Sequence, residues 1–276
     1  MADEQQALAA IQPEPGVPKP DPILVITGLQ RTFGGLRAVD VDHIEVQRNT
    51  VTSLIGPNGA GKTTLFNLVT GFDEADAGTW QLNGGPLVGI PAYQVARRGM
   101  VRTFQLTRAL PRLTVIENVM LAAKDNPGES MIRGLIGGWR GLETDIASRG
   151  RVLLERFGLA HMTEEYAGTL SGGQRKLLEL ARALMVEPEV VMLDEPMAGI
   201  NPALTEVLLT HITGLQEEGK TVVFIEHDMD VVQEISDWVV VMAEGRVIAE
   251  DRPRGIAGNP LVIDAYLGAH HGEAAS

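Results

Sequence analysis

Nine consecutive residues have the types and spacing of a phosphate-binding loop. They are Gly56, Pro57, Asn58, Gly59, Ala60, Gly61, Lys62, Thr63 and Thr64. Their form, G-x-x-x-x-G-K-[ST] between a strand and a helix, is typical of proteins that bind nucleoside triphosphates. An apolar, β-branched run at residues 51–55 precedes the loop, and a helix-forming run at residues 65–69 follows it. The alternative, a glycine-rich turn with an unrelated lysine, does not account for this order of elements.

The chemistry expected of this loop is the binding of phosphate and of a magnesium ion. Its glycines allow backbone N–H groups to turn inward, and the following helix adds a partial positive charge at its N-terminus. We expect Lys62 to reach the β- and γ-phosphates, and we expect the hydroxyl of Thr63 to ligate Mg²⁺.

Two adjacent carboxylates, Asp194 and Glu195, follow the apolar run at residues 190–193. In open α/β sheets ligands bind at the carboxyl ends of the strands, so this pair is expected near the loop. We expect Asp194 to hold Mg²⁺, directly or through water, and Glu195 to act as general base on the attacking water. Acids at a strand end are a weak signal alone, but beside the loop they indicate hydrolysis of a triphosphate.

A second glycine-containing helix start lies later in the chain. Gly172 and Gly173 precede a helical run at residues 176–184, and Ser171 can cap that helix. The free N–H groups of a helix start can face an anion. On residue types alone, an ordinary capped helix start and a second phosphate site are equally acceptable interpretations.

The composition indicates a globular chain. Of its 276 residues, 44% are hydrophobic and 21% are charged, and cysteine is absent. The net charge of -13 disfavours contact with a nucleic-acid backbone, so we expect no nucleic-acid partner. No apolar run has the length of a membrane span, and the N-terminus has no signal-peptide pattern. We therefore expect a cytoplasmic protein that would act at a membrane only through partner subunits.

The elements that must position these residues alternate between strand and helix in the second half of the chain. Strands are expected at residues 189–193, 221–225 and 238–242, and helices at residues 203–217 and 229–236. This alternation predicts an α/β fold with a mostly parallel sheet and helices on both faces.

The first half of the chain has a different pattern. Residues 1–22 are polar and proline-rich, which predicts a disordered or extended lead. Residues from about 106 to 180 repeat apolar side chains mostly at helical spacing, except that residues 125–141 are either a weak amphipathic helix or a loop. An antiparallel layer is expected from short strands at residues 23–27, 36–39, 43–46 and 78–85.

Taken together, the loop, LSGGQ at residues 170–174 and LDEP at residues 193–196 resemble the ATP-binding-cassette (ABC) family. The resemblance covers residues 23–268 and leaves the lead and a tail at residues 269–276 outside it. It implies a single P-loop nucleotide triphosphatase (ABC ATPase) domain of the α/β class. In that domain an antiparallel β subdomain and a helical subdomain, at about residues 106–180, accompany a mostly parallel sheet. It also implies ATP and Mg²⁺ as ligands.

The resemblance further implies a head-to-tail dimer and a set of partners. Each ATP would lie on the phosphate loop of one chain and under the LSGGQ segment of the other. The partners implied are a second ATPase subunit, identical or different, transmembrane permease subunits and, indirectly, a substrate-binding protein. The chain would then be peripheral on the inner face of the cell membrane. The LSGGQ residues expected at nucleotide are Ser171, Gly172, Gly173 and Gln174.

Three more positions match the family individually. Phe33 stands where the family places an aromatic ring on adenine, although a lone phenylalanine is more often part of the core. Gln105 resembles the glutamine that touches Mg²⁺ or water and links the core to the helical subdomain. His227 resembles the switch histidine at the γ-phosphate, whereas the residue type alone favours a structural role. The resemblance therefore implies catalytic roles for Lys62, Gln105, Glu195 and His227, and metal contacts for Thr63, Gln105 and Asp194.

One position departs from the commonest family pattern, because Asn201 stands where many members have an aspartate in the dimer-contact loop. The segment around it, together with residues 102–105, 114–119, 225–229 and 259–268, resembles the G-type ATP-binding subunits of branched-chain amino-acid importers. The expected function is ATP hydrolysis that drives such an importer by dimer closure. The alternatives are the ATPase of a urea or amide importer, that of a lipopolysaccharide-type exporter, and a soluble ABC ATPase outside transport.

Overall fold

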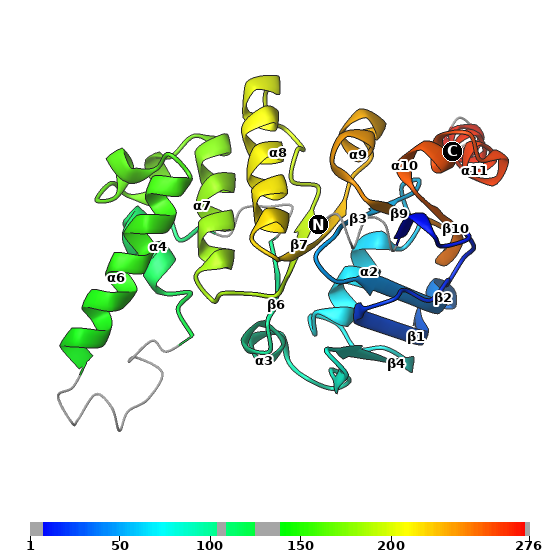
Figure 1. Cartoon of the computed structure of the whole chain (residues 1–276), viewed down its shortest axis with the longest axis horizontal. Coiled ribbons are helices and arrows are strands. Elements are labelled where there is room, and N and C mark those ends of the chain that lie inside the picture. The colour runs from blue at the N-terminus through cyan, green and yellow to red at the C-terminus, as the bar shows by residue number, and fades with distance from the viewer. Residues whose placement is uncertain (1–7, 104–108, 125–138, 274–276) are drawn as a thin grey trace.

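The computed structural model describes residues 8–103, 109–124 and 139–273, and it contains two β-sheets (Figure 1). The central sheet has the strand order β10-β9-β3-β8-β7-β6, in which β10 alone is antiparallel to its neighbour and the other pairs are parallel. Its strands are β10 (Arg246–Asp251), β9 (Trp238–Ala243), β3 (Val51–Ile55), β8 (Thr221–Ile225), β7 (Val190–Asp194) and β6 (Met100–Arg102). The mostly parallel sheet that the sequence predicts is therefore confirmed.

The second sheet is antiparallel, with the order β2-β1-β4-β5. The sequence predicts separate strands at residues 36–39 and 43–46, and this is wrong because one twelve-residue strand covers both. That strand pairs with β1 along its whole length, and its buried Val39, Val41 and Ile44 continue across the expected break. The members are β1 (Pro22–Phe33), β2 (Leu36–Gln47), β4 (Ala77–Leu82) and β5 (Gly85–Pro86).

The two faces of the central sheet pack against different layers. Alternate residues point to opposite faces of a strand, so Val191 and Leu193 join one apolar cluster while Val190 and Met192 join another. The first cluster includes side chains of α7, α8 and α9, and the second includes α2 and the antiparallel sheet. The helices are α2 (Lys62–Val69), α7 (Gly172–Leu184), α8 (Pro202–Glu217) and α9 (Met229–Ile235).

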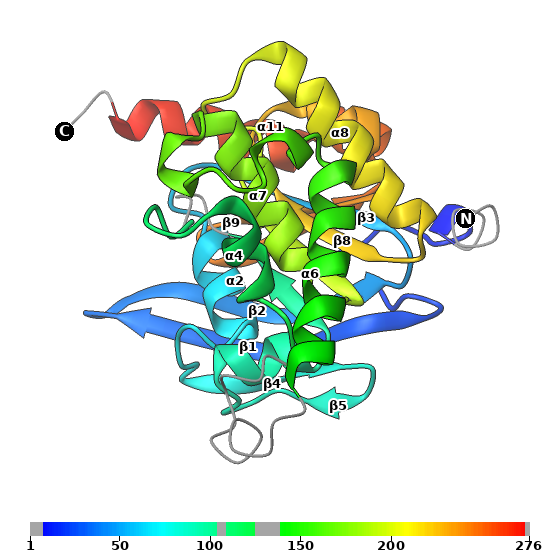
Figure 2. The same cartoon turned by 90° about the vertical axis from the view of Figure 1, so that its left-hand side faces the viewer.

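The predicted helical region lies at one end of the molecule (Figures 1 and 2). Its helices α4 (Val115–Met120), α6 (Trp139–Arg156) and α7 contact one another and contribute to the same apolar cluster. Thr114 caps α4 with a capping box. Its side chain accepts from the backbone N–H of Glu117, and the Glu117 side chain accepts from the backbone N–H of Thr114. Short 3₁₀ turns, η2 (Ala160–Met162) and η3 (Ala167–Thr169), lead into α7. Most of the segment 125–141, whose structure the sequence leaves open, lies outside the described residues.

The N-terminal lead is packed on the sheet from Leu8 onward, mostly without regular secondary structure. The Nζ of Lys19 donates to Oε2 of Glu250 at 2.9 Å, and the indole N–H of Trp238 donates to the same oxygen at 2.9 Å. Lys19 and Glu250 are both buried, so their opposite charges compensate each other away from water. The described part of the lead has helical residues at 8–9 and a turn at 15–16, so it is packed on the fold but is not extended throughout.

The described residues also form two short strands, β6 and β10, and three helices at positions where the sequence predicts no element. α3 (Ala92–Arg97) precedes β6, and α10 (Pro253–Ala257) and α11 (Pro260–Glu273) follow β10. Because α11 continues to Glu273, the fold extends beyond residue 268, where the sequence analysis places its end. No helix within the described ranges is both long and apolar enough to cross a membrane.

The strand order places three functional segments at one edge of the central sheet. β3 pairs in parallel with β8, and β8 pairs in parallel with β7. The carboxyl ends of these three neighbours therefore lie side by side. The phosphate loop follows β3, Glu195 follows β7, and Glu226 and His227 follow β8.

Candidate nucleotide site

The phosphate loop, residues 56–64, connects β3 to α2 as the sequence predicts. Gly56 and Gly61 have positive φ angles of 145° and 95°, which side chains rarely adopt. A Cβ on Gly56 would overlap the carbonyl of Met242, and a Cβ on Gly61 would overlap the carbonyl of Ala38. Glycine is therefore required at both positions by the close approach of neighbouring backbone.

Lys62 begins α2 and its ammonium lies within the loop. Nζ donates to the carbonyl oxygens of Gly56 at 2.7 Å and Pro57 at 2.9 Å. Burial lowers the pKa of Lys62, and the nearby carboxylates of Glu195 and Asp194 act in the opposite direction. The charges of both acids therefore act on the ammonium of Lys62, so the loop and these two acids belong to one site.

Asp194 ends β7 in a buried ion pair that the sequence analysis does not anticipate. Nη2 of Arg102 lies 2.6 Å from Oδ2 of Asp194, and Nη1 of Arg102 donates to Oδ1 of Asn67 at 2.6 Å. The Arg102 and Asp194 side chains are only 3% and 2% exposed. Oδ1 of Asp194 is also buried, and it has no hydrogen-bond partner among the described residues. A buried carboxylate oxygen without a partner is a suitable ligand for a cation.

Glu195 follows Asp194 in a backbone conformation that is unusual for a residue with a side chain. Its φ is 47°, in the left-handed region. Its N–H donates to the carbonyl of Ile225, at the end of the neighbouring strand β8, at 3.1 Å. Such strain occurs often at functional sites, where the surrounding contacts hold it. The backbone thus turns directly after the metal-binding candidate Asp194.

Glu226 and His227 follow β8 and differ sharply in exposure. The Glu226 carboxylate is buried and accepts from the backbone N–H of Met197 at 3.0 Å and of His227 at 3.2 Å. Burial raises the pKa of Glu226 above 4.5, against the smaller lowering effect of these bonds. The His227 side chain is 66% exposed, so it is not a core histidine. Its position after β8 suits a residue that contacts a ligand at this sheet edge.

Phe33 ends β1 on the surface. It is 45% exposed, which excludes the alternative that it belongs to the core. The guanidinium of Arg31 lies 4.6 Å from the ring centroid, and Arg31 is itself paired with Asp73 and Asp76. An exposed ring beside a fixed cation can stack on a nucleobase.

The helix start at Ser171 has the capping that the sequence predicts, but it lies apart from the phosphate loop. Ser171 Oγ accepts from the Gln174 N–H at 3.2 Å, and Oε1 of Gln174 accepts from the Ser171 N–H at 2.9 Å. Ser171 and Gly172 are exposed, whereas a Cβ on Gly173 would overlap Leu204 of α8. Figure 1 shows α7 and α2 well separated, and no hydrogen bond or ion pair between described residues joins Ser171 to the loop. This helix start therefore faces outward within one chain.

Two other predicted positions have different outcomes. Gln105 lies outside the described residues. Asn201 caps α8, because its Oδ1 accepts from the Leu204 N–H at 2.9 Å and Pro202 occupies the first turn. Asparagine is among the best N-cap residues and proline is favoured at the first helical position. Aspartate caps a helix as well as asparagine does, so the cap explains a short polar residue at this position but not the choice of asparagine over the family's aspartate.

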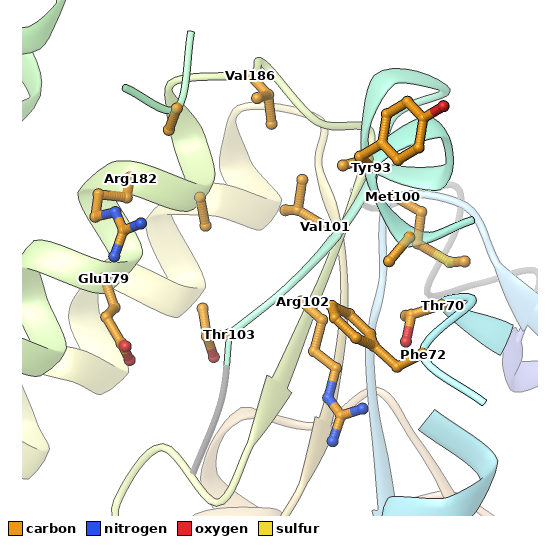
Figure 3. Close-up of a pocket in the computed structure, with 14 residues that line it drawn as sticks. Thr70, Phe72, Tyr93, Met100, Val101, Arg102, Thr103, Glu179, Arg182 and Val186 are labelled. Atoms are coloured by element: carbon orange, nitrogen blue, oxygen red, sulfur yellow. The ribbon is translucent and has the colours of Figure 1, made fainter. Parts of the chain in front are cut away.

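A separate groove lies between the central sheet and the helical region. Its volume is about 550 Å³, and its lining is mostly apolar, with Ala96 and Val101 on one side and Ala183 on the other. Figure 3 shows Arg182 and Glu179 on the α7 side of the pocket, with Tyr93 of α3 across from them. Tyr93 is 61% exposed.

The arrangement around the loop can bind and hydrolyse a nucleoside triphosphate. The loop offers a cation and backbone N–H groups, Asp194 offers a ligand oxygen for a metal, and Glu195 offers a base one residue later. The exposed helix start at Ser171 lies apart from the phosphate loop of its own chain.

Comparison with known proteins identifies the same architecture. Residues 39–198 match the family model described as "ABC transporter", and residues 246–272 match one described as "Branched-chain amino acid ATP-binding cassette transporter". The chain is 42% identical to the high-affinity branched-chain amino acid transport ATP-binding protein BraF of Pseudomonas aeruginosa, over 90% of this chain and 98% of that one. It is 39% identical to the probable LivG protein of Archaeoglobus fulgidus, over 91% and 97% of the two chains.

Solved structures agree with this comparison. The chain superimposes on the ADP conformation of an ATP-binding cassette of an ABC transporter with a TM-score of 0.78, at 36% identity, covering 90% of this chain and 99% of that one. A nucleotide-free cassette gives a TM-score of 0.77 at 36% identity, with 89% and 98% of the two chains covered.

Proposed function

The chain belongs to the ABC transporter family, and we propose that it is the ATP-hydrolysing subunit of an importer for branched-chain amino acids. The observation that carries the substrate class is the match at residues 246–272, which lies outside the nucleotide machinery. Those residues form β10, α10 and most of α11. Relatives named for branched-chain amino-acid transport cover nearly the whole chain, which supports the same assignment.

In the proposed reaction Lys62 binds the phosphates of ATP. Its ammonium already lies inside the loop, held by two carbonyl oxygens, and can exchange these for bonds to anionic phosphate oxygens, in which both partners are charged. Glu195 accepts a proton from the attacking water, and His227, exposed at the end of β8, contacts the γ-phosphate. Phe33 stacks on the adenine, which leaves the triphosphate to the loop.

The residues also fit a magnesium ion. Oδ1 of Asp194, which has no hydrogen-bond partner within the described ranges, and the hydroxyl of the exposed Thr63 are oxygen ligands of the kind that Mg²⁺ prefers, and Gln105 is the third candidate. Bound there, Mg²⁺ would neutralise charge on the β- and γ-phosphates.

A second cassette completes the proposed site. Ser171 and Gly172 are exposed at the start of α7 and can reach the phosphates on another chain's loop. ATP then lies between two chains and holds them together until it is hydrolysed. The second cassette is a copy of this chain or a related subunit.

The groove between α3, β6 and α7 is the proposed docking site for the permease. Its apolar lining and volume of about 550 Å³ suit one turn or two of an amphipathic helix, and Glu179 and Arg182 offer charged contacts on the α7 side. Docking on membrane subunits places the chain at the inner face of the membrane. A substrate-binding protein would act on the far side of the same transporter.

The substrate class is tested by uptake in cells that lack this chain. Plasmid-borne wild-type protein is expected to restore uptake of labelled leucine, isoleucine and valine, and Lys62→Ala is expected to restore none. Uptake of labelled urea is measured in the same cells. Rescue of urea uptake without rescue of leucine uptake would replace the proposal by the urea or amide importer.

The composite site is tested with Glu195→Gln, which keeps the shape of the side chain but removes the base. Loss of a positioned base costs about 10²–10⁴-fold in rate, so the ATP-bound dimer is expected to persist. Light scattering after size exclusion should show a dimer with ATP and a monomer with ADP. The double variant Glu195→Gln, Ser171→Arg should remain monomeric. A Glu195→Gln variant that binds ATP and stays monomeric would contradict dimer closure in the isolated chain.

A further inference from the structure

Lys176 on α7 binds the loop that carries Glu195. Its Nζ donates to the carbonyl oxygen of Pro196 at 2.8 Å and of Ala198 at 2.5 Å, and it lies 3.5 Å from the carbonyl oxygen of Glu195. Three carbonyls of one short turn therefore converge on a single ammonium. Burial lowers the pKa of Lys176, while the carboxylates of Glu226, Glu179 and Glu195 favour its charged form.

Glu226 holds the same turn through a different backbone group. Its Oε1 accepts from the Met197 N–H at 3.0 Å, and its Oε2 accepts from the His227 N–H at 3.2 Å. In the turn at residues 195–198, Lys176 of α7 thus binds the carbonyl groups, and Glu226 at the end of β8 binds the Met197 N–H. The same Glu226 also joins the turn to His227.

This double attachment acts on a strained residue. Glu195 has a left-handed φ of 47°, and its carbonyl also accepts from the Ala198 N–H at 3.1 Å, which closes the turn. Relaxation of that backbone would rotate the direction in which the side chain leaves it. The position of the Glu195 carboxylate therefore depends on the bonds that Lys176 makes.

Lys176 lies on the same helix as Ser171. Five residues of α-helix span about 7.5 Å, so a shift of the helix start is passed on directly to the ammonium. In the proposed dimer Ser171 faces the nucleotide on the partner chain, while Glu195 acts on the nucleotide of its own chain. Lys176 is the link between these two positions within one chain.

We propose that Lys176 is a positioning residue that couples the two nucleotide sites of the dimer. When Ser171 contacts nucleotide at one site, the position of α7 is fixed. Lys176 then holds Glu195 in the position needed for hydrolysis at the other site. This inference rests on the proposed dimer. Coupling between two sites is reciprocal for binding, so each nucleotide should favour the other's engagement.

The test compares Lys176→Gln and Lys176→Arg with wild type, with Lys220→Gln as a matched control on a distant turn. Steady-state hydrolysis is measured against ATP concentration, and ATP affinity is measured by calorimetry. For Lys176→Gln we expect unchanged ATP affinity and a Hill coefficient that falls to one. We also expect kcat to fall about 10²-fold, which is the effect that a misplaced catalytic group produces. Lys176→Arg keeps a charge that can reach the carbonyls and should retain cooperativity.

The outcomes separate this inference from the proposed function. Cooperative hydrolysis by Lys176→Gln, with wild-type kcat, overturns the coupling role and leaves the dimer intact. Non-cooperative hydrolysis by wild type, together with a monomeric Glu195→Gln variant, overturns the dimer itself and the inference with it. A folded Lys176→Gln variant that loses ATP affinity in proportion to kcat shows a binding role and also overturns the proposal. Far-UV circular dichroism establishes that each variant is folded.

Discussion

Removal of the Arg102 guanidinium should destabilise the chain far more than removal of a surface arginine. Arg102 is 3% exposed and lies 2.6 Å from the 2% exposed carboxylate of Asp194. Arg102→Ala leaves that carboxylate buried without its cation and also removes a donor from Oδ1 of Asn67. Breaking a buried pair from one side typically costs about 3–5 kcal/mol, because the remaining charge is uncompensated.

Thermal and urea unfolding, without nucleotide or Mg²⁺, measure the effect. For a chain of this size 1 kcal/mol corresponds to about 2–4 °C, so the midpoint should fall by roughly 6–20 °C. The control is Arg37→Ala, whose partner is Asp40 at 3.2 Å and whose side chain is 53% exposed. A surface pair of that kind is worth about 0–1 kcal/mol, so the control should unfold almost as wild type does.

A second variant separates the unpaired charge from lost packing. The double variant Arg102→Ala, Asp194→Asn lacks both charges of the buried pair, so part of the lost stability should return. If Arg102→Ala unfolds within about 1 kcal/mol of Arg37→Ala, the pair does not have the energetic weight that its burial implies. If the double variant is less stable than Arg102→Ala, uncompensated charge is not the cause.

Substitutions at three further positions test other parts of the chain. Phe33→Ala should weaken ATP and ADP binding by about 1–3 kcal/mol in calorimetry, while Phe33→Trp should bind as wild type does; unchanged binding by Phe33→Ala would exclude stacking. Asn201→Ala should cost about 0.5–2 kcal/mol in urea unfolding by removing the cap of α8, and Asn201→Asp should cost little, unless the cap contributes nothing. Burial raises the pKa of Glu226, so the folded chain holds this proton at higher pH than the unfolded chain, and wild-type stability falls as pH rises from 4.5 through the folded pKa. Glu226→Gln keeps the acceptor for the Met197 amide and removes this fall; its stability in urea relative to wild type should rise as the pH increases above 4.5, and parallel profiles would contradict the assignment.

The parts of the site that could be predicted from the sequence depend on local physics. The loop at residues 56–64 needs glycines where neighbouring backbone approaches, a lysine, and a helix directly after it, and all three are contiguous. The strand before Asp194 is a short apolar run that is buried throughout, so its end could be placed without knowing its neighbours. Ser171 and Gln174 form a capping box within four residues.

The parts that could not be predicted depend on partners far apart in the chain. Nothing in the local sequence distinguishes Arg102 from the other arginines. The parallel pairing of β6 with β7 places it beside Asp194, which lies 92 residues later in the chain. Lys19 lies in a proline-rich lead that resembles a disordered segment, yet it pairs with Glu250, 231 residues away. Alternation of apolar residues identifies strands but not the long-range charges that meet between them.

The two cations that support the acids of the site are carried on the two connections between the central sheet and the helical region. The chain leaves the sheet after β6, whose last residue is Arg102, and it returns to β7 along α7, which carries Lys176. Arg102 compensates Asp194, and Lys176 holds the turn of Glu195. A movement of the helical region relative to the sheet must therefore alter the surroundings of both acids together, and the groove that we assign to the permease is bordered by the same two elements. In the proposed transporter, docking of the permease in that groove would therefore act on both acids through charges that are already in place.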